Sequence, residues 1–262
     1  MVLVYLFEGV SRHMKILIAE HYEELCKLSA AIIKEQIQAK KDAVLGLATG
    51  STPVGLYKQL ISDYQAGEID FSKVTTFNLD EYAGLSPSHP QNYNHFMHEH
   101  LFQHINMQPD HIHIPQGDNP QLEAAYKVYE DLIRQAGGID VQILGIGANG
   151  HIGFNEPGSD FEDRTRVVKL SESTIQANAR FFGGDPVLVP RLAISMGIKT
   201  IMEFSKHIVL LASGEEKADA IQKMAEGPVT TDVPASILQK HNHVTVIADY
   251  KAAQKLKSAS FS

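Results

Sequence analysis

The chain has 262 residues, enough for one large α/β domain or two small ones. Its formal net charge of −8 argues against a nucleic-acid-binding surface, and no apolar run approaches the roughly 20 residues that span a bilayer. The single cysteine, Cys26, excludes an internal disulfide and a cysteine-based zinc site, and it fits a reducing cytoplasm.

The N-terminal segment is apolar but lacks the basic start and the cleavage site of a signal peptide. Met14 directly precedes the apolar run Lys15–Ile18, which is typical of a first strand. Residues 1–13 are therefore expected to be an extension outside the fold, with a short edge strand as the alternative. Residues 14–262 are expected to form a single α/β domain.

Short apolar, β-branched runs alternate with longer amphipathic segments along this domain. Such alternation predicts an open, mostly parallel, doubly wound (Rossmann-like) sheet with helices on both faces. The expected strands are Lys15–Ala19, Val44–Ala48, Val74–Leu79, Ile112–Pro115, Val141–Ile146, Ala193–Met196, His207–Ala212 and Val244–Ala248. The expected helices are Tyr22–Ala39, Pro53–Gln65, Asn92–His104, Gln121–Ala136, Glu215–Ala225 and Lys251–Lys257.

One long stretch, at about residues 158–190, is irregular and rich in Gly, Asp and Arg. Only its part near Ser173–Arg180 is expected to be helical. A loop of this length in a compact domain is usually a lid or a binding segment, and we expect a lid here.

The stretch GLATGSTP, from Gly46, runs off an expected strand into an expected helix. Small residues let the backbone approach a ligand, and the N–H groups at a helix N-terminus bind anions. The hydroxyls of Thr49, Ser51 and Thr52 add donors. Because there is no lysine in the Walker position, a single phosphate on a small molecule is favoured over a nucleoside triphosphate. A capped helix start without a ligand is the alternative.

Two adjacent carboxylates, Asp80 and Glu81, follow the expected strand that ends at Leu79. Neighbouring side chains on an extended chain point in opposite directions, so only one of the two is expected to face a pocket. A carboxylate at the carboxyl end of a strand suits a general base when partial burial raises its pKa. A solvated acidic turn is the alternative.

The stretch LGIGANGHIGFNEPG, from Leu144, begins with the G-x-G-x-x-G pattern of dinucleotide-binding loops. That interpretation needs a helix directly after the pattern, where a further glycine and a Pro-Gly pair break any helix. A catalytic loop is favoured, because His151 can titrate near neutral pH and Glu156 can reach back to orient its imidazole. A lone hydrogen-bonded loop histidine is the alternative.

Two basic side chains further along the chain are candidates for binding a phosphate. Arg180 lies in the stretch NARFF inside the expected lid, and Lys217 lies in SGEEK just past an expected strand. Both can form charge-assisted bonds to phosphate, and a solvated surface charge is the alternative for each.

Seven of the 13 histidines fall between His89 and His113. Pairs such as His95/His98 have a helical spacing that can bind a metal ion, but few acidic ligands lie near them. A solvated helix face is favoured, and no metal is expected.

The five stretches GLATGSTP, FNLDEY, LGIGANGHIGFNEPG, NARFF and SGEEK, in this order, resemble the glucosamine-6-phosphate deaminase family. The resemblance extends from Met14 to the end of the chain, and FNLDEY together with GHIGFNEPG is its most specific part. It implies conversion of glucosamine 6-phosphate and water into fructose 6-phosphate and ammonia, in amino-sugar catabolism and without a cofactor.

The resemblance also implies roles for particular residues. Asp80 would take the proton from C2 and carry it to C1. His151 would help to open the pyranose ring, oriented by Glu156 and Asn149. The phosphate would be bound by Thr49, Gly50, Ser51, Thr52, Arg180 and Lys217.

The chain departs from much of this family at Asn149, where many members carry Asp. The neutral amide can still accept a hydrogen bond from the imidazole, but His151 should hold its proton less tightly than beside a carboxylate. Resemblance to the shorter members favours a monomer without activation by N-acetylglucosamine 6-phosphate, with a homo-oligomer as the alternative.

Two other functions share this kind of fold, which does not by itself fix function. One is a related sugar-phosphate enzyme, such as a 6-phosphogluconolactonase, from which ammonia release would discriminate. The other is a sugar-phosphate-sensing domain, which usually carries a DNA-binding helix-turn-helix for which residues 1–13 are too few. We therefore expect a small-molecule partner, glucosamine 6-phosphate, and neither nucleic acid nor membrane.

Overall fold

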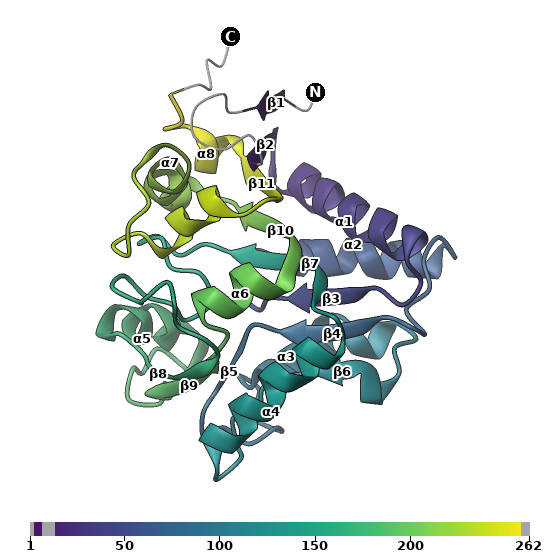
Figure 1. Ribbon diagram of the computed structural model, residues 1–262, viewed down its shortest axis with the longest axis vertical. Coiled ribbons are helices and arrows are strands. Elements are labelled where there is room, and N and C mark those ends of the chain that lie inside the picture. Colours follow the sequence, from purple (N-terminus) through teal and green to yellow (C-terminus); the bar gives the residue numbers. More distant parts are fainter. Residues whose placement is uncertain (1–2, 7–13, 258–262) are drawn as a thin grey trace.

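The computed structural model describes residues 3–6 and 14–257 of the chain. The strands of its central sheet are β1 (Leu3–Leu6), β2 (Met14–Ala19), β3 (Val44–Leu47), β4 (Thr75–Asn78), β6 (Ile112–His113), β7 (Ile139–Gly145), β10 (Ser205–Ala212) and β11 (Val244–Asp249). Their order is β1-β2-β11-β10-β7-β3-β4-β6, and every neighbouring pair is parallel except β1 with β2 (Figure 1). The open, mostly parallel sheet predicted from the sequence is confirmed.

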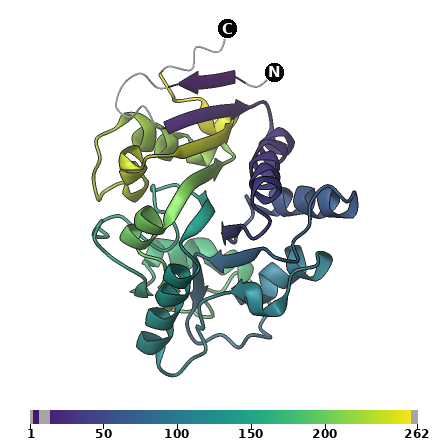
Figure 2. The ribbon, with the colours of Figure 1, turned by 45° about the vertical axis from the view of Figure 1, so that its right-hand side comes forward.

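The helices are α1 (Tyr22–Ala39), α2 (Val54–Gln65), α3 (Tyr93–His100), α4 (Leu122–Gln135), α5 (Glu172–Asn178), α6 (Ile198–Phe204), α7 (Ala218–Glu226) and α8 (Tyr250–Ala253). They cover both faces of the sheet, with α1 and α2 on one face and α6 and α7 on the other (Figures 1 and 2). The first helix shows why these segments are helical. His21 caps its N-terminus by accepting from the Glu24 amide, and Leu25, Ile33 and Ile37 turn one apolar face into the core.

A second, antiparallel sheet contains β5 (Asp80–Tyr82), β9 (Leu192–Ser195) and β8 (Arg166–Lys169), in that order. With α5 it buries an apolar cluster of its own, made of Tyr82, Phe154, Val168, Leu170, Ile175, Ala179, Phe182, Val189 and Ala193. The predicted strand at Ala193–Met196 therefore belongs to this small sheet, and residues 158–190 include β8 as well as a helix. Neither β5 nor β8 was predicted as a separate strand, because three or four residues that include charged side chains show too little apolar alternation.

Helix boundaries also differ from the prediction in places. The helix expected over Asn92–His104 ends at His100 and is followed by a 3₁₀ turn at Phe102–His104. The last helix is Tyr250–Ala253 rather than Lys251–Lys257. Neither α6 nor the 3₁₀ segment Pro234–Lys240 was predicted.

The N-terminal segment takes part in the sheet. Leu3–Leu6 pair antiparallel with β2, from Leu3 opposite Ile18 to Leu6 opposite Lys15. The expectation that residues 1–13 lie outside the fold does not hold for these four residues, because the edge of β2 offers backbone donors and acceptors to an extended segment. Residues 1–2 and 7–13 lie outside the described residues.

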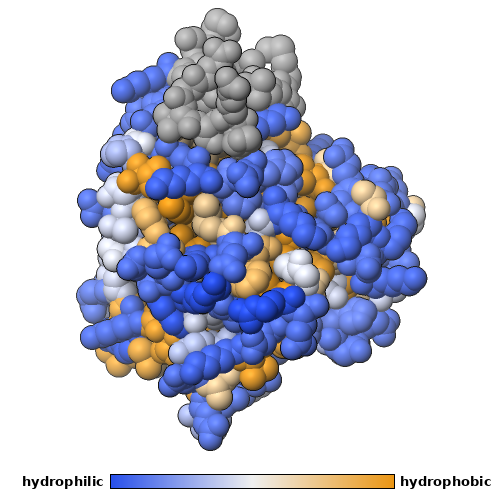
Figure 3. Space-filling view, viewed as in Figure 1, coloured by the Kyte–Doolittle hydropathy of each residue, from blue (hydrophilic) through white to orange (hydrophobic). Residues whose placement is uncertain are grey.

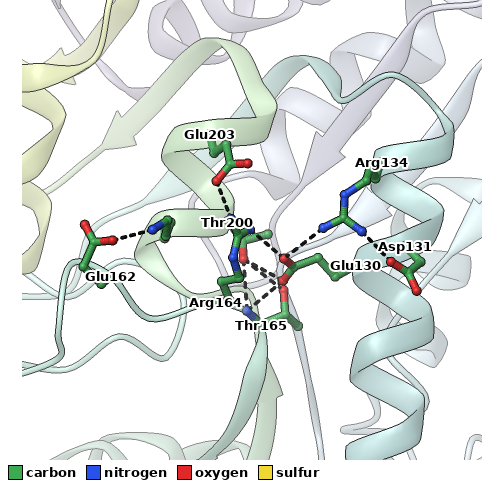
Figure 4. Close-up of polar contacts among 9 residues, drawn as sticks. Glu130, Asp131, Arg134, Glu162, Arg164, Thr165, Thr200 and Glu203 are labelled. Atoms are coloured by element: carbon green, nitrogen blue, oxygen red, sulfur yellow. Dashed lines mark hydrogen bonds and ion pairs between the residues drawn. The ribbon is translucent and has the colours of Figure 1, made fainter.

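A buried carboxylate ties the small sheet to the helices beside it (Figure 4). Glu130 of α4 accepts hydrogen bonds from the Arg164 guanidinium at 2.8 Å, the Thr165 amide at 3.1 Å and the Thr200 hydroxyl at 2.9 Å. Arg164 also pairs with Glu203 of α6 at 2.6 Å. Charge-assisted bonds of this kind are roughly twice as strong as neutral ones, so they fix the start of β8.

In the described part of the chain, no helix is long and apolar enough to cross a membrane. Hydrophilic side chains cover most of the face seen in Figure 3, with apolar side chains in small separate patches.

Candidate active site

The three loops singled out from the sequence meet at the carboxyl ends of β3, β4 and β7, as expected for ligand sites in parallel sheets. There they line a cavity of about 460 Å³, here called the inner cavity. Eight of the predicted site residues line it, namely Thr49, Gly50, Ser51, Thr52, Asp80, His151, Arg180 and Lys217. The remaining two lie outside the cavity lining: Asn149 binds His151, and Glu156 binds Asn149.

The turn of residues 49–52, between β3 and α2, is here called the anion-binding turn after its predicted role, and it is held by Tyr22. The Tyr22 hydroxyl donates to the Thr52 carbonyl at 2.8 Å and accepts from the Gly55 amide at 2.9 Å. Gly50 has a φ of 103°, a left-handed conformation that favours glycine. The N-cap residue of α2 is Pro53, and no side-chain hydrogen bond caps this helix. The hydroxyls of Ser51 and Thr52 thus cap no helix, whereas the Thr49 hydroxyl is hydrogen-bonded with Tyr93.

Arg180 and Lys217 approach this turn from two different elements. Arg180 lies in a 3₁₀ turn after α5, with its guanidinium 4.6 Å from the centroid of the Phe181 ring. Burial lowers the pKa of Lys217; the Glu216 carboxylate opposes this shift, and the positive charge of Arg180 adds to it. The loop before Lys217 is anchored by the buried Asp249, which accepts from the Gly214 amide at 3.1 Å. Two cations that repel each other in this way favour an anion between them.

Asp80 is the buried carboxyl group of the inner cavity. It is 7% exposed and accepts no hydrogen bond from the described residues. Burial, and to a lesser extent the neighbouring Glu81, raise the pKa of Asp80 to about 8. Once ionised, a carboxylate with this pKa is a stronger base than one on the surface, which suits removal of a proton from carbon.

Glu81 points away from the inner cavity. Its carboxylate accepts from the backbone amides of Tyr82 at 2.8 Å, Tyr93 at 3.0 Å and Asn94 at 3.1 Å, so it binds the N-terminus of α3. Burial raises its pKa to about 7 despite these three bonds. The prediction that only one of the two adjacent carboxylates faces a pocket is confirmed, and neither belongs to a solvated turn.

His151, Asn149 and Glu156 form a chain of polar contacts. The Nδ1 atom of His151 lies 2.7 Å from Oδ1 of Asn149, and Nδ2 of Asn149 donates to Oε2 of Glu156 at 2.9 Å. An ionised carboxylate only accepts, so the amide nitrogen faces Glu156 and the amide oxygen faces the imidazole. Nδ1 of His151 therefore carries the proton, and Nε2 is the free nitrogen of the neutral ring.

This chain modifies the prediction that Glu156 orients the imidazole directly. The distance from Nδ1 of His151 to Oε2 of Glu156 is 3.6 Å, too long for a hydrogen bond, and Asn149 bridges the two groups. Burial lowers the pKa of His151 below its usual 6.5, and the charge of Glu156 offsets this only in part. Burial raises the pKa of Glu156, but hydrogen bonds from Thr174, Asn149 and Ser171 and the nearby His151 produce a net lowering.

Two glycines are required by the close packing of this loop. A Cβ on Gly147 would overlap the His151 ring. Gly153 has a φ of 56°, which favours glycine, and a Cβ there would lie 3.2 Å from the Ser195 hydroxyl oxygen. The next helix in the described chain is α5, which begins at Glu172, so the loop lacks the helix that a dinucleotide-binding loop needs.

Several cavity residues were not singled out from the sequence. Asn178 of α5 donates to the Tyr82 hydroxyl at 2.8 Å, and both line the inner cavity with Gln91, Tyr93 and Phe181. Tyr82 lies in the stretch FNLDEY, and Asn178 and Phe181 lie in NARFF, but the sequence did not indicate that their side chains line the cavity. Gln91 and Tyr93, at or just before the start of α3, belong to none of the five stretches. Among the described residues, no group of three or more His, Cys, Asp or Glu side chains is arranged to hold a metal ion, the histidine-rich segment included.

Comparison with known proteins gives a consistent picture. Residues 18–247 match the model of the family described as glucosamine-6-phosphate isomerases/6-phosphogluconolactonase. The chain is 99% identical over 249 residues to glucosamine-6-phosphate deaminase 2 of Bacillus subtilis (strain 168), covering 95% of this chain and 100% of that protein. It is 56% identical over 240 residues to the glucosamine-6-phosphate deaminase of Thermoanaerobacter sp. (strain X514), covering 92% and 94%.

Solved structures agree with these relatives. A monomeric glucosamine-6-phosphate deaminase is 49% identical and superposes with a TM-score of 0.89, covering 92% of this chain and 99% of that one. A 6-phosphogluconolactonase from Trypanosoma brucei is 19% identical with a TM-score of 0.74, covering 92% and 98%. The second likeness shows a shared fold only.

Proposed function

The chain belongs to the family of glucosamine-6-phosphate isomerases and 6-phosphogluconolactonases, and from this premise we propose that it is a glucosamine-6-phosphate deaminase. It converts glucosamine 6-phosphate and water into fructose 6-phosphate and ammonia. One observation carries the proposal: a buried carboxyl group and a neutral imidazole line the same cavity as an anion-binding turn and two cations. The deaminases that are 99% and 56% identical support the choice of substrate.

The sugar phosphate binds at the turn formed by residues 49–52, between Arg180 and Lys217. Backbone amides and hydroxyls of the turn donate to the phosphate oxygens, and the two cations neutralise its charge. This contact places the carbon chain of the sugar along the inner cavity, towards Asp80 and His151.

His151 opens the pyranose ring. Its free Nε2 takes the proton of the anomeric hydroxyl and returns a proton to the ring oxygen, as the C1–O5 bond breaks and C1 becomes an aldehyde. The transient imidazolium is stabilised through Asn149 by the charge of Glu156, whose own ionisation is supported by Thr174 and Ser171. The neutral resting state of the ring follows from the lowered pKa of His151.

Asp80 then removes the C2 proton of the open chain and returns it to C1, while one proton of the C2 ammonium group passes to O1. The product of this step carries a C=N bond at C2, and water hydrolyses it to the ketone of fructose 6-phosphate while ammonia leaves. In the free protein Asp80 has a pKa of about 8, so the carboxyl group holds its proton at pH 7. The ammonium group on C2 of the substrate, placed beside it, lowers this pKa and ionises the base where it is needed.

Ammonia release from purified protein and glucosamine 6-phosphate, with fructose 6-phosphate assayed in parallel, tests the proposal. Equal amounts of both products, lost together in Asp80→Asn, are expected. Absence of both products from a protein that binds the sugar phosphate would favour a related enzyme or a sugar-phosphate sensor. Release of acid from a 6-phosphogluconolactone without ammonia formation would favour the lactonase.

We also propose that the chain acts as a monomer in the cytoplasm. The 49% identical deaminase structure is described as monomeric, and the lone Cys26 is a free, buried thiol, which suits a reducing compartment. Light scattering after gel filtration should give the mass of one chain, with and without N-acetylglucosamine 6-phosphate. A larger particle in either case would contradict the monomer.

A further inference from the structure

A second cavity, of about 840 Å³, opens on the other side of the anion-binding turn. This outer cavity is lined by α1 and α2 and by the loop that carries Lys217. The two cavities share five lining residues: Ser51, Thr52, Val54, Arg180 and Lys217. A phosphoryl group between Arg180 and Lys217 therefore faces both cavities. The proposed substrate has a single phosphate, so it does not account for the charged lining of the outer cavity.

The outer cavity gathers positive charge in a chain whose formal net charge is −8. Its cations are Lys27 of α1, Lys58 of α2, Arg180 and Lys217, and its acids are Glu23 and Glu216, so four positive and two negative charges leave a formal +2. None of the four cations forms an ion pair with a described residue, whereas Glu23 lies 3.1 Å from the imidazole of His21. Unpaired cations that line a concave surface raise the local concentration of anions.

The remainder of the lining is rigid and uncharged at neutral pH. The Tyr22 hydroxyl is held by the Thr52 carbonyl and the Gly55 amide, and burial raises its pKa to about 12. Cys26 packs so closely on Gly55 that a Cβ there would lie 2.4 Å from its sulfur. Packing between α1 and α2 thus fixes the uncharged part of the outer cavity. Lys27 of α1 and Lys58 of α2 are exposed and lie at its edge.

We propose that the outer cavity is a subsite for the second phosphoryl group of a diphosphate compound whose first phosphoryl group lies between Arg180 and Lys217. The two cavities share these cations, so the two anionic groups must be directly linked, as they are in a diphosphate. Guanidinium and ammonium groups on both sides can then each bind a different phosphoryl group. Such a ligand occupies the position of the substrate phosphate and competes with it. Only this competition rests on the proposed function.

Calorimetric titration with inorganic pyrophosphate and with inorganic phosphate tests the subsite without any need for turnover. The variant Lys27→Gln/Lys58→Gln is compared with Lys41→Gln/Lys73→Gln, which removes the same charge from exposed positions outside both cavities. Wild-type protein should bind pyrophosphate at least about tenfold more tightly than phosphate, a difference of about 1.4 kcal/mol. The first variant should lose most of this preference and the second should keep it.

Three outcomes would overturn the subsite: no preference in the wild type, the same preference in the first variant, or an equal loss in both variants. The last would mean that general charge attraction is sufficient. Because all four lysines are exposed, the variants are expected to fold, and a thermal melt checks this. A protein that releases ammonia but shows no preference for pyrophosphate would keep the proposed function and lose only the subsite.

Discussion

Replacing Asp80 by Asn tests the electrostatics of the inner cavity through stability as well as activity. The pKa of this carboxyl group is about 8 in the folded protein, against roughly 3.9 for an aspartate in an unfolded chain. The difference of about four units corresponds to on the order of 5 kcal/mol, at about 1.36 kcal/mol per unit. The main cause of the raised pKa is burial of the carboxyl group without a hydrogen-bond partner. An uncharged side chain of the same shape should therefore remove this free-energy cost of ionisation.

The sign of the effect follows from proton binding. Between pH of about 4 and 8 the unfolded chain has lost the proton of Asp80 and the folded protein still holds it, so rising pH favours unfolding until the folded group also ionises. Asn has no proton to lose. The free energy of unfolding of Asp80→Asn minus that of the wild type should therefore increase by about 4 kcal/mol from pH 5 to pH 8. The unpaired buried amide of the variant costs about 1–3 kcal/mol at every pH. This cost shifts the difference in unfolding free energy by a constant and does not change how the difference varies with pH.

Urea denaturation of both proteins across this pH range measures the slope, with Asp110→Asn at an exposed position as the control. The same preparation should bind the sugar phosphate and should lose at least about 10²–10⁴ in turnover, as expected for removal of a general base. A stability difference that stays constant with pH would refute the desolvated carboxyl group. Failure of the folded variant to bind the sugar phosphate would refute the assignment of Asp80 as a base alone.

The other predicted changes separate ring opening from phosphate binding. His151→Gln should slow the ring-closed substrate most, and an equal loss with an analogue that cannot close its ring would argue against ring opening by this imidazole. Lys217→Ala should raise KM by about 10- to 100-fold in initial-rate assays, because a charge-assisted contact is worth about 1.5–3 kcal/mol, and an unchanged KM would place Lys217 outside the phosphate site. Tyr22→Phe should raise KM more than it lowers kcat and should lower Tm, because it leaves the Gly55 amide without its partner. A wild-type KM in that variant would show that the turn holds its shape without the hydroxyl.

The main sheet could be predicted because its strands are clear apolar runs separated by amphipathic helices. Residues Ile208–Ala212 of β10, for example, are all buried and form a single hydrophobic run. The small sheet could not be predicted in the same way. Its pairs, such as Asp80 opposite Ser195, join segments far apart in the sequence, and Leu192 of the same sheet is exposed. Tertiary contacts rather than local pattern decide such strands.

The candidate site could be predicted where a motif leaves the end of a parallel strand, which is where Asp80 and His151 lie. The sequence could not show which helix supports such a loop. Tyr22 stands in an ordinary amphipathic helix, and only the fold brings its hydroxyl beneath Thr52. The resemblance implied the contact between the Asn149 oxygen and the imidazole, but spacing alone also allowed Glu156 to contact the ring directly, so its indirect action through Asn149 was not predicted.

The pKa values indicate that one of the two proposed catalytic groups, Asp80, reaches its active protonation state only when the substrate is bound. In the free protein at pH 7 the imidazole of His151 is neutral and ready to accept a proton, but Asp80, with a pKa of about 8, is protonated. If the ammonium group of the substrate lowers the pKa of Asp80 below 7, binding must release a proton. Calorimetry of a non-reacting amino-sugar phosphate in buffers of different ionisation enthalpy should detect up to one proton released at pH 7. Asp80→Asn should release none, and neither should glucose 6-phosphate bound to the wild type, because it lacks the ammonium group. Equal release with both sugars would mean that the phosphate end, rather than Asp80, loses the proton.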